Sequence, residues 1–138
     1  MAKISHVERT MKIIKAETDL AVVVERWNPH VRRADGGRGI RQDLLGIIDI
    51  LALTHFKPLR AIQVCGTDYQ SHWVKIVQQK RLQAHLWLSS GATLEIWAWR
   101  KLKVKRGGKI CRWEPRVVPV RIEDLGPMPS KENIDIFS

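Results

Sequence analysis

Hydrophobic residues recur first at helical and then at strand spacing along the N-terminal part of the chain. Residues 5–17 carry apolar side chains close to one face at helical spacing, which predicts a short helix. Residues 20–27 are rich in β-branched side chains and predict a strand, which an Asn-Pro pair ends. Residues 30–42 contain three glycines and four arginines without an apolar period, so we expect a mobile basic loop there.

The middle of the chain predicts the core of a sheet and a helix that packs on it. Residues 43–54 are apolar on both strand faces, which is typical of a central buried strand. Residues 59–65 predict its neighbour, and Gly66-Thr67-Asp68 offers N-cap candidates for a helix over about residues 70–89. The apolar stripe of this helix consists of Trp73, Ile76, Val77, Ala84, Trp87 and Leu88.

The C-terminal part of the chain is basic. Residues 93–100 predict a further strand, and residues 100–121 carry nine Lys or Arg side chains against one acid. Gly107-Gly108 divides that stretch, so we expect a basic β-hairpin. From residue 124 the chain is rich in proline and polar residues. We therefore expect a single domain over residues 1–123 and a flexible tail over residues 124–138.

Composition adds a strong positive charge to this α/β pattern. The 138 residues fit one domain with its own core. Lys and Arg number 24 against 14 acids, a formal charge of +10, which favours a polyanionic partner such as nucleic acid. No stretch is long and apolar enough to span a bilayer, and the N-terminus lacks a signal-peptide core, so we expect a cytoplasmic protein without a membrane partner. Cys65 and Cys111 lack metal-site spacing, so oxygen ligands should hold any metal.

Asp49 is the most informative residue for chemistry. It lies among aliphatic neighbours in the predicted central strand, where an unpaired carboxylate is costly. Asp43 shares its strand face, and Gln63 on the next strand would meet Asp49 if the two strands pair. The oxygens of Asp49 and Gln63, with the backbone carbonyl of Val64, suit Mg²⁺ or Mn²⁺, a cation that activates water against a phosphodiester. The alternative is a structural aspartate that pairs with an arginine.

The order of the elements resembles that of the PD-(D/E)XK nuclease superfamily. GIIDILAL would supply its second-strand aspartate as Asp49, and AIQVCG would fill the acid-x-Lys position as Gln63-Val64-Cys65. With VERWNP, SHWVKI and LEIWAWRK, the similarity extends over about residues 5–101 to small phage-type nucleases related to Holliday-junction resolvases and VRR-NUC domains. The resemblance implies a restriction-endonuclease-like αβββαβ core, a mixed central sheet flanked by helices, to which the basic C-terminal β-hairpin is added.

Two positions depart from the family pattern. Gln63 replaces an acid, and Cys65 replaces the lysine that orients the water. The resemblance implies that Lys75, on the following helix, replaces this lysine, whereas its place away from the apolar stripe also fits an ordinary solvated side chain. The further acid would be Glu8 in the first helix or Glu25 in the first strand. We favour Glu25 because its charge otherwise interrupts a buried strand.

Basic residues lie on both sides of this site in the sequence. The glycine-rich stretch and the basic hairpin are expected to contact phosphates. The candidate side chains are Arg32, Arg33, Arg38, Arg41, Lys101, Lys103, Lys105 and Arg106. His72, at the start of the central helix, is a further candidate for a phosphate contact or a general base, and a solvent-facing histidine is the simpler alternative.

Together these patterns favour a Mg²⁺- or Mn²⁺-dependent endonuclease that hydrolyses DNA, with branched or flap DNA as candidate substrates. A catalytically degenerate nuclease fold that binds DNA or RNA is the alternative, because Gln63 and Cys65 depart from the motif. An assembly protein with an acidic protein partner is a third and weaker hypothesis. The resemblance further implies a homodimer and a phage protein that acts in the host cytoplasm.

Overall fold

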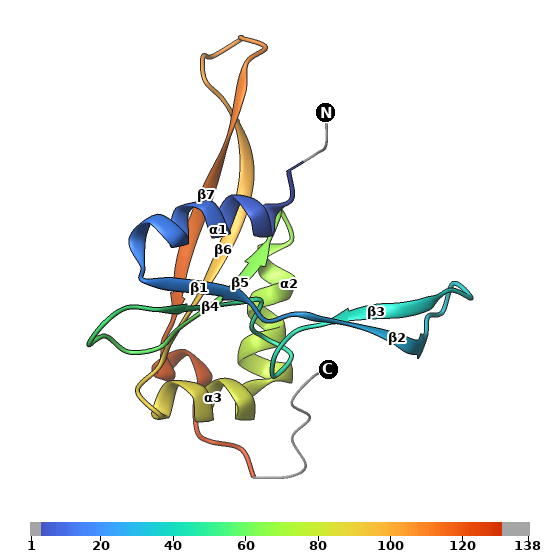
Figure 1. The fold of residues 1–138 in the computed structure, drawn as a ribbon, viewed down its shortest axis with the longest axis vertical. Coiled ribbons are helices and arrows are strands. Elements are labelled where there is room, and N and C mark those ends of the chain that lie inside the picture. Colours follow the sequence, from blue (N-terminus) through green and yellow to red (C-terminus); the bar gives the residue numbers. More distant parts are fainter. Residues whose placement is uncertain (1–3, 131–138) are drawn as a thin grey trace.

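The computed structural model describes residues 4–130, and its centre is a five-stranded mixed sheet flanked by helices (Figure 1). In spatial order the strands are β1 (Leu20–Val23), β4 (Ile50–Leu53), β5 (Arg60–Cys65), β6 (Thr93–Lys103) and β7 (Cys111–Val120). Strands β5 and β6 are parallel, and every other neighbouring pair in this sheet is antiparallel. The predicted α/β class with a mixed sheet is therefore confirmed.

Helices cover both faces of the sheet. On one face lies α1 (His6–Glu17), whose first turn is capped by the Ser5 hydroxyl, which accepts from the Glu8 amide at 3.1 Å. On the other face the chain forms α2 (Tyr69–Val74), the π-helical turn η1 (Lys75–Gln79) and α3 (Arg81–Ser89). A short 3-10 turn, η2 (Ile122–Leu125), follows β7. The single helix predicted over residues 70–89 is thus three consecutive segments.

The strand periodicity of β5 separates two hydrophobic layers. Ile62 and Val64 pack with Ile14 of α1, whereas Ala61 and Cys65 pack in the layer that contains Ile76 and Ala84 of the other helices. The second of these layers contains the whole predicted apolar stripe of the helix. A buried hydrogen bond of 2.7 Å from the Trp99 indole N–H to the Thr10 hydroxyl also joins α1 to the sheet.

The stretch that we expected to be a mobile loop is a second, two-stranded sheet. Strands β2 (Arg26–Arg32) and β3 (Arg38–Gln42) pair antiparallel and project from the body of the molecule (Figure 1). Asp35 holds the turn, because its carboxylate accepts from the Gly37 amide at 2.8 Å and pairs with Arg33. Gly39 has φ +93°, and a β-carbon there would lie 2.0 Å from the Trp27 ring, so the ring packs directly on the backbone. The loop prediction was wrong. The hydrogen bonds of the turn and the packing of Trp27 on Gly39 stabilise this hairpin, although its sequence has no periodic pattern of apolar residues.

The predicted strand over residues 43–54 is also shorter than expected. Only Ile50–Leu53 forms β4. The preceding residues form a tight turn, in which Leu44 and Ile48 exchange backbone hydrogen bonds of 3.0 Å and Leu45 and Gly46 have positive φ values. Ile47 and Ile48 are fully buried in this turn, so the continuous apolar run reports burial and not strand geometry.

Strands β6 and β7 continue beyond the sheet as a long two-stranded arm (Figure 1). Residues 104–110 connect them, and Gly107 in this connection has φ +78°. After β7, Leu125 is 2% exposed and packs in the core, so the folded domain extends through Leu125 and not only to residue 123. Of the expected tail, residues 131–138 lie outside the described residues.

Candidate metal centre

Three carboxylates converge beside the start of β4. One carboxylate oxygen from each of Glu25, Asp43 and Asp49 lies within 4.8 Å of the others. The register of the small sheet explains why two of the three carboxylates are neighbours. Arg26 pairs with Gln42, and the residues just outside that pair are Glu25 and Asp43. The third carboxylate is brought in by the main chain, since the carbonyl of Asp49 accepts from the Val24 amide at 2.8 Å.

Asp43 belongs to this cluster although we did not include it among the candidate ligands. In the predicted extended strand, the six residues from Asp43 to Asp49 would separate the two side chains by about 20 Å. The turn over residues 44–48 brings the two carboxylates together instead. Asp43 is therefore close to Asp49, as a shared strand face would suggest, but the cause is a turn. The apolar pattern of residues 44–48 does not reveal this turn.

Asp49 is buried in the middle of this arrangement. Its side chain is 4% exposed, and Oδ2 accepts from the Gln63 amide at 2.5 Å and from the Val64 backbone N–H at 2.8 Å. Burial, reinforced by Asp43 nearby, raises the pKa of Asp49 to about 8, although the bonds from Val64 and Gln63 act in the opposite direction. Asp49 therefore holds a proton at neutral pH that a divalent cation would displace.

Gln63 joins two of the carboxylates. Its side chain is 1% exposed, and its amide nitrogen donates to Asp49 and, at 3.3 Å, to Asp43. Its Oε1 atom is buried and lacks a hydrogen-bond partner within the described part of the chain, at a cost of about 1–3 kcal/mol. Rotation of the amide by half a turn would present this oxygen to the carboxylates, so the donor set fits a hard cation such as Mg²⁺ or Mn²⁺. Val64 contacts Asp49 through its N–H, whereas we expected its carbonyl to face the site.

The structure places Lys75 beside the carboxylates. Its Nζ atom lies 3.5 Å from Asp43 Oδ2, and its side chain is 26% exposed. Lys75 is the first residue of the π-helical turn, a feature that often occurs at functional sites. Cys65, which occupies the lysine position of the motif, is buried, and burial raises the pKa of its thiol to about 11. Cys65 is therefore a neutral thiol, and Lys75 brings a positive charge to the cluster.

Of the two acids left open by the sequence, Glu25 lies in the cluster and Glu8 does not. Glu8 is exposed on the first turn of α1. Both side chains nevertheless line one cavity of about 530 Å³, together with Ser5, Val7, Val23 and Arg41. Arg41 Nη1 lies 2.9 Å from Glu25 Oε1. This cavity gives the carboxylate cluster an open side with a guanidinium at its edge.

The expected phosphate-binding residues lie on two projecting arms. Arg32 and Arg38 face each other across the small sheet, whereas Arg33 and Arg41 form ion pairs with acids of the same region. On the β6–β7 arm, the four expected side chains are all exposed: Lys101, Lys103, Lys105 and Arg106. His72 does not point freely into solvent, because its Nε2 atom lies 3.0 Å from Asp68 Oδ2.

Among the described residues, no helix combines the length and the apolar character that crossing a bilayer requires. Comparison of the chain with family models, with curated proteins and with solved structures gives no match. Any functional conclusion therefore depends on the residues of this chain and on their arrangement.

Proposed function

We propose that this protein is a metal-dependent nuclease that hydrolyses phosphodiester bonds in DNA. The observation that carries the proposal is the convergence of Glu25, Asp43 and Asp49 within 4.8 Å around a buried, easily protonated carboxyl group. These three residues would hold Mg²⁺ or Mn²⁺, and Gln63 would add its amide oxygen. When bound, the cation supplies an activated water and offsets the negative charge of the phosphate.

The neighbouring residues have complementary functions in this proposal. Lys75, 3.5 Å from Asp43, places a fixed positive charge beside the cluster, where it can stabilise the charge that develops on a phosphate. Arg41, on the edge of the cavity, is positioned to contact the phosphate backbone of the substrate. Burial of Asp49 excludes bulk water, which strengthens these electrostatic contributions.

The order of elements also supports a restriction-endonuclease-like core. Helix α1, strands β1, β4 and β5, the α2–α3 segment and β6 follow the αβββαβ order in sequence. In this interpretation the β2–β3 hairpin is an insertion after the first core strand, and β7 extends the sheet. Asp49 then lies at the start of the second core strand, and Gln63-Val64-Cys65 ends the third.

DNA is the substrate that the charge favours. The formal charge is +10, and the exposed lysines and arginines concentrate on two arms that project from the body (Figure 1). Arms that leave the body in different directions suit a substrate with more than one duplex segment. We therefore include four-way junctions and flaps beside linear duplexes among the substrates to be tested.

A binding module without catalysis is the second candidate function. It is favoured by the hydrogen bonds of Gln63, whose amide nitrogen rather than its oxygen faces the two aspartates. It is favoured also by the neutral thiol at position 65. In that case the arms would bind nucleic acid while Asp49 remains protonated and the cluster holds no metal.

Cleavage assays on supercoiled, linear, flap and four-way-junction DNA distinguish these functions. We expect cleavage in Mg²⁺ or Mn²⁺, none in EDTA, and loss of at least about 100-fold in Asp49→Asn. Glu123→Gln, an exposed acid in η2, is the matched control and should cleave like the wild type. Tight, salt-dependent binding without cleavage of any substrate would establish the binding module, and full activity in Asp49→Asn would refute the site.

A further inference from the structure

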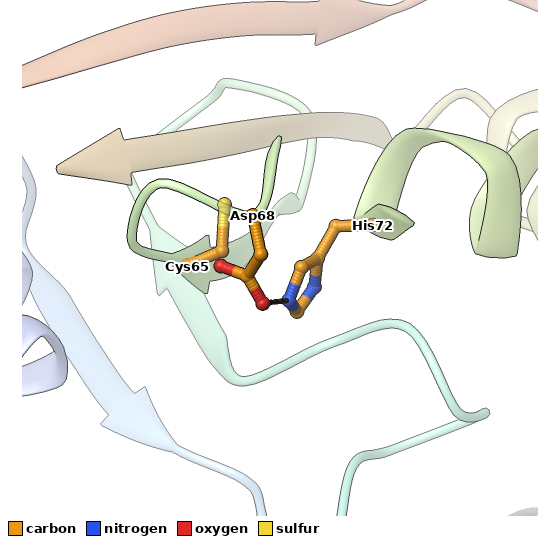
Figure 2. Close-up of side chains that lie close together, drawn as sticks. All are labelled: Cys65, Asp68 and His72. Atoms are coloured by element: carbon orange, nitrogen blue, oxygen red, sulfur yellow. Dashed lines mark hydrogen bonds and ion pairs between the residues drawn. The ribbon is translucent and has the colours of Figure 1, made fainter. Parts of the chain in front are cut away.

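A second cluster of ligand-type side chains lies where β5 ends. Cys65 is the last residue of β5, Asp68 precedes α2, and His72 lies one turn further along the chain. One ligand atom from each lies within 4.8 Å of the others. Figure 2 shows the sulfur, the carboxylate and the imidazole grouped around the turn, with the His72–Asp68 contact of 3.0 Å drawn as a dashed line.

The backbone positions these three side chains independently of any ligand. Cys65 is fixed by its parallel pairing with Ala98 of β6. Asp68 is oriented by the Gly66 amide, which donates to its Oδ1 atom at 3.1 Å. His72 and Asp68 are four residues apart, the spacing that places two side chains on one side of a helical turn.

The ligand-type side chains of this cluster differ in burial and in hydrogen bonding. The Nδ1 atom of His72 is buried and has no hydrogen-bond partner within the described part of the chain, although Nε2 contacts Asp68. The Cys65 side chain is buried, so its sulfur adds a soft ligand that is shielded from solvent. A thiolate, an imidazole and a carboxylate form a donor set that selects zinc-type cations over Mg²⁺.

We propose that Cys65, Asp68 and His72 form a second metal centre that binds Zn²⁺ or a similar soft divalent cation, with its fourth position open to solvent. Tetrahedral zinc with bonds of about 2.0–2.3 Å places its ligand atoms about 3.3–3.8 Å apart. The ligand atoms lie within 4.8 Å of one another, so any pair needs to approach by at most about an ångström. The Asp68 side chain, which is 60% exposed, has room to move. Three protein ligands with an open position are typical of a reactive or exchangeable zinc site.

This centre is chemically distinct from the carboxylate cluster, and it does not depend on the proposed nuclease function. Cys65 and Gln63 are two positions apart on β5, so both side chains project from one face of the strand. That face of β5 would thus carry the amide oxygen of Gln63 and, two residues later, the sulfur of Cys65. A cation bound to His72 would also fix the beginning of α2, the segment that leads to Lys75.

Titration of the reduced, oxygen-free protein with Co²⁺ tests the proposal, because a cobalt–thiolate bond gives a charge-transfer absorption that oxygen ligands do not give. We expect one equivalent to produce this absorption in the wild type and in Cys111→Ser, which removes the exposed cysteine. Cys65→Ser should abolish it. Asp68→Asn and His72→Gln should weaken Co²⁺ binding by about tenfold or more, since even groups that only orient ligands contribute that much.

Two results would overturn the second centre. One is a wild-type protein that gives no thiolate charge transfer with Co²⁺. The other is an absorption that survives in Cys65→Ser but disappears in Cys111→Ser or in Asp49→Asn, which would place cobalt elsewhere. Far-UV circular dichroism of each variant shows that the fold persists. Failure of the nuclease proposal is separate, because Asp49→Asn should lose Mn²⁺ binding and keep the cobalt–thiolate absorption.

Discussion

Replacement of Asp49 by asparagine should make the metal-free protein more stable at neutral pH. Asparagine can still accept hydrogen bonds from the Val64 amide and from Gln63, and it can donate to Asp43, as the protonated aspartic acid does. It removes the ionisable group whose pKa burial and Asp43 raise to about 8. Asp49→Ala is a poorer probe, because it leaves the Val64 N–H buried without this acceptor, at a cost of about 1–3 kcal/mol.

The magnitude follows from the pH dependence of one proton. In the unfolded chain the pKa of Asp49 is about 3.9. Below that pH both states are protonated and the contribution of Asp49 to stability is fully present. As the pH rises, the unfolded state releases a proton that the folded state keeps up to about pH 8, so stability is lost at about 1.4 kcal/mol per pH unit. Between pH 5 and pH 7 the wild type should therefore lose about 2–3 kcal/mol relative to Asp49→Asn.

Chemical unfolding in EDTA at pH 5 and pH 7 measures this difference, with Glu123→Gln as the control that should follow the wild type. Mn²⁺ should then reverse the order. At 100 times its dissociation constant it adds about 2.7 kcal/mol to a protein that binds it only when folded, and it should add nothing to Asp49→Asn. A stability difference that stays constant between the two pH values would refute the raised pKa of Asp49, and equal stabilisation of both proteins by Mn²⁺ would refute the carboxylate site.

Three further substitutions test the site, the arms and the fold. Lys75→Met should lower the cleavage rate about 100-fold or more, while Lys12→Met, on the exposed face of α1, should not change it; equal rates would leave Lys75 without a function in catalysis. Lys103→Ala should reduce the slope of log affinity for DNA against log salt by about 1, and an unchanged slope would exclude a phosphate contact at this position. Thr10→Val should cost about 1–3 kcal/mol in denaturant unfolding, because the buried Trp99 N–H loses its acceptor, whereas Thr10→Ser should stay close to the wild type.

The elements that pack on the sheet could be predicted from the sequence. Helix α1 (His6–Glu17), strand β5 (Arg60–Cys65) and the start of β6 at Thr93 agree closely with the predicted ranges. Each of these buries one face or both in the core, so its pattern of apolar residues records its period directly. The expected meeting of Asp49 and Gln63 also followed from strand pairing, and the two side chains are in contact at 2.5 Å.

The parts that shape the site could not be predicted in this way. The β2–β3 hairpin is mostly exposed, so no apolar period marks its strands, and a turn carboxylate and the Trp27–Gly39 contact stabilise it. The turn before β4 is as apolar as a strand because Ile47 and Ile48 are buried there. The π-helical turn that begins at Lys75 leaves no sign in the residue pattern. Apolar periodicity records burial, whereas turns and register changes decide which charges meet.

The burial of Asp49 and Gln63 is better explained by a function than by a contribution to stability. A buried pair such as Asp49 and Gln63 could be replaced by apolar residues of similar size, often with a gain in stability. Instead, a carboxyl group with a raised pKa lies beside an amide oxygen that has no hydrogen-bond partner among residues 4–130. Glu25 and Asp43 add charge to the same place, and both are carried by the ends of a basic hairpin. Departures from good packing concentrate at functional sites. A cation would relieve all of these strains together, and the hairpin that supplies two of its ligands is also an arm that would contact DNA.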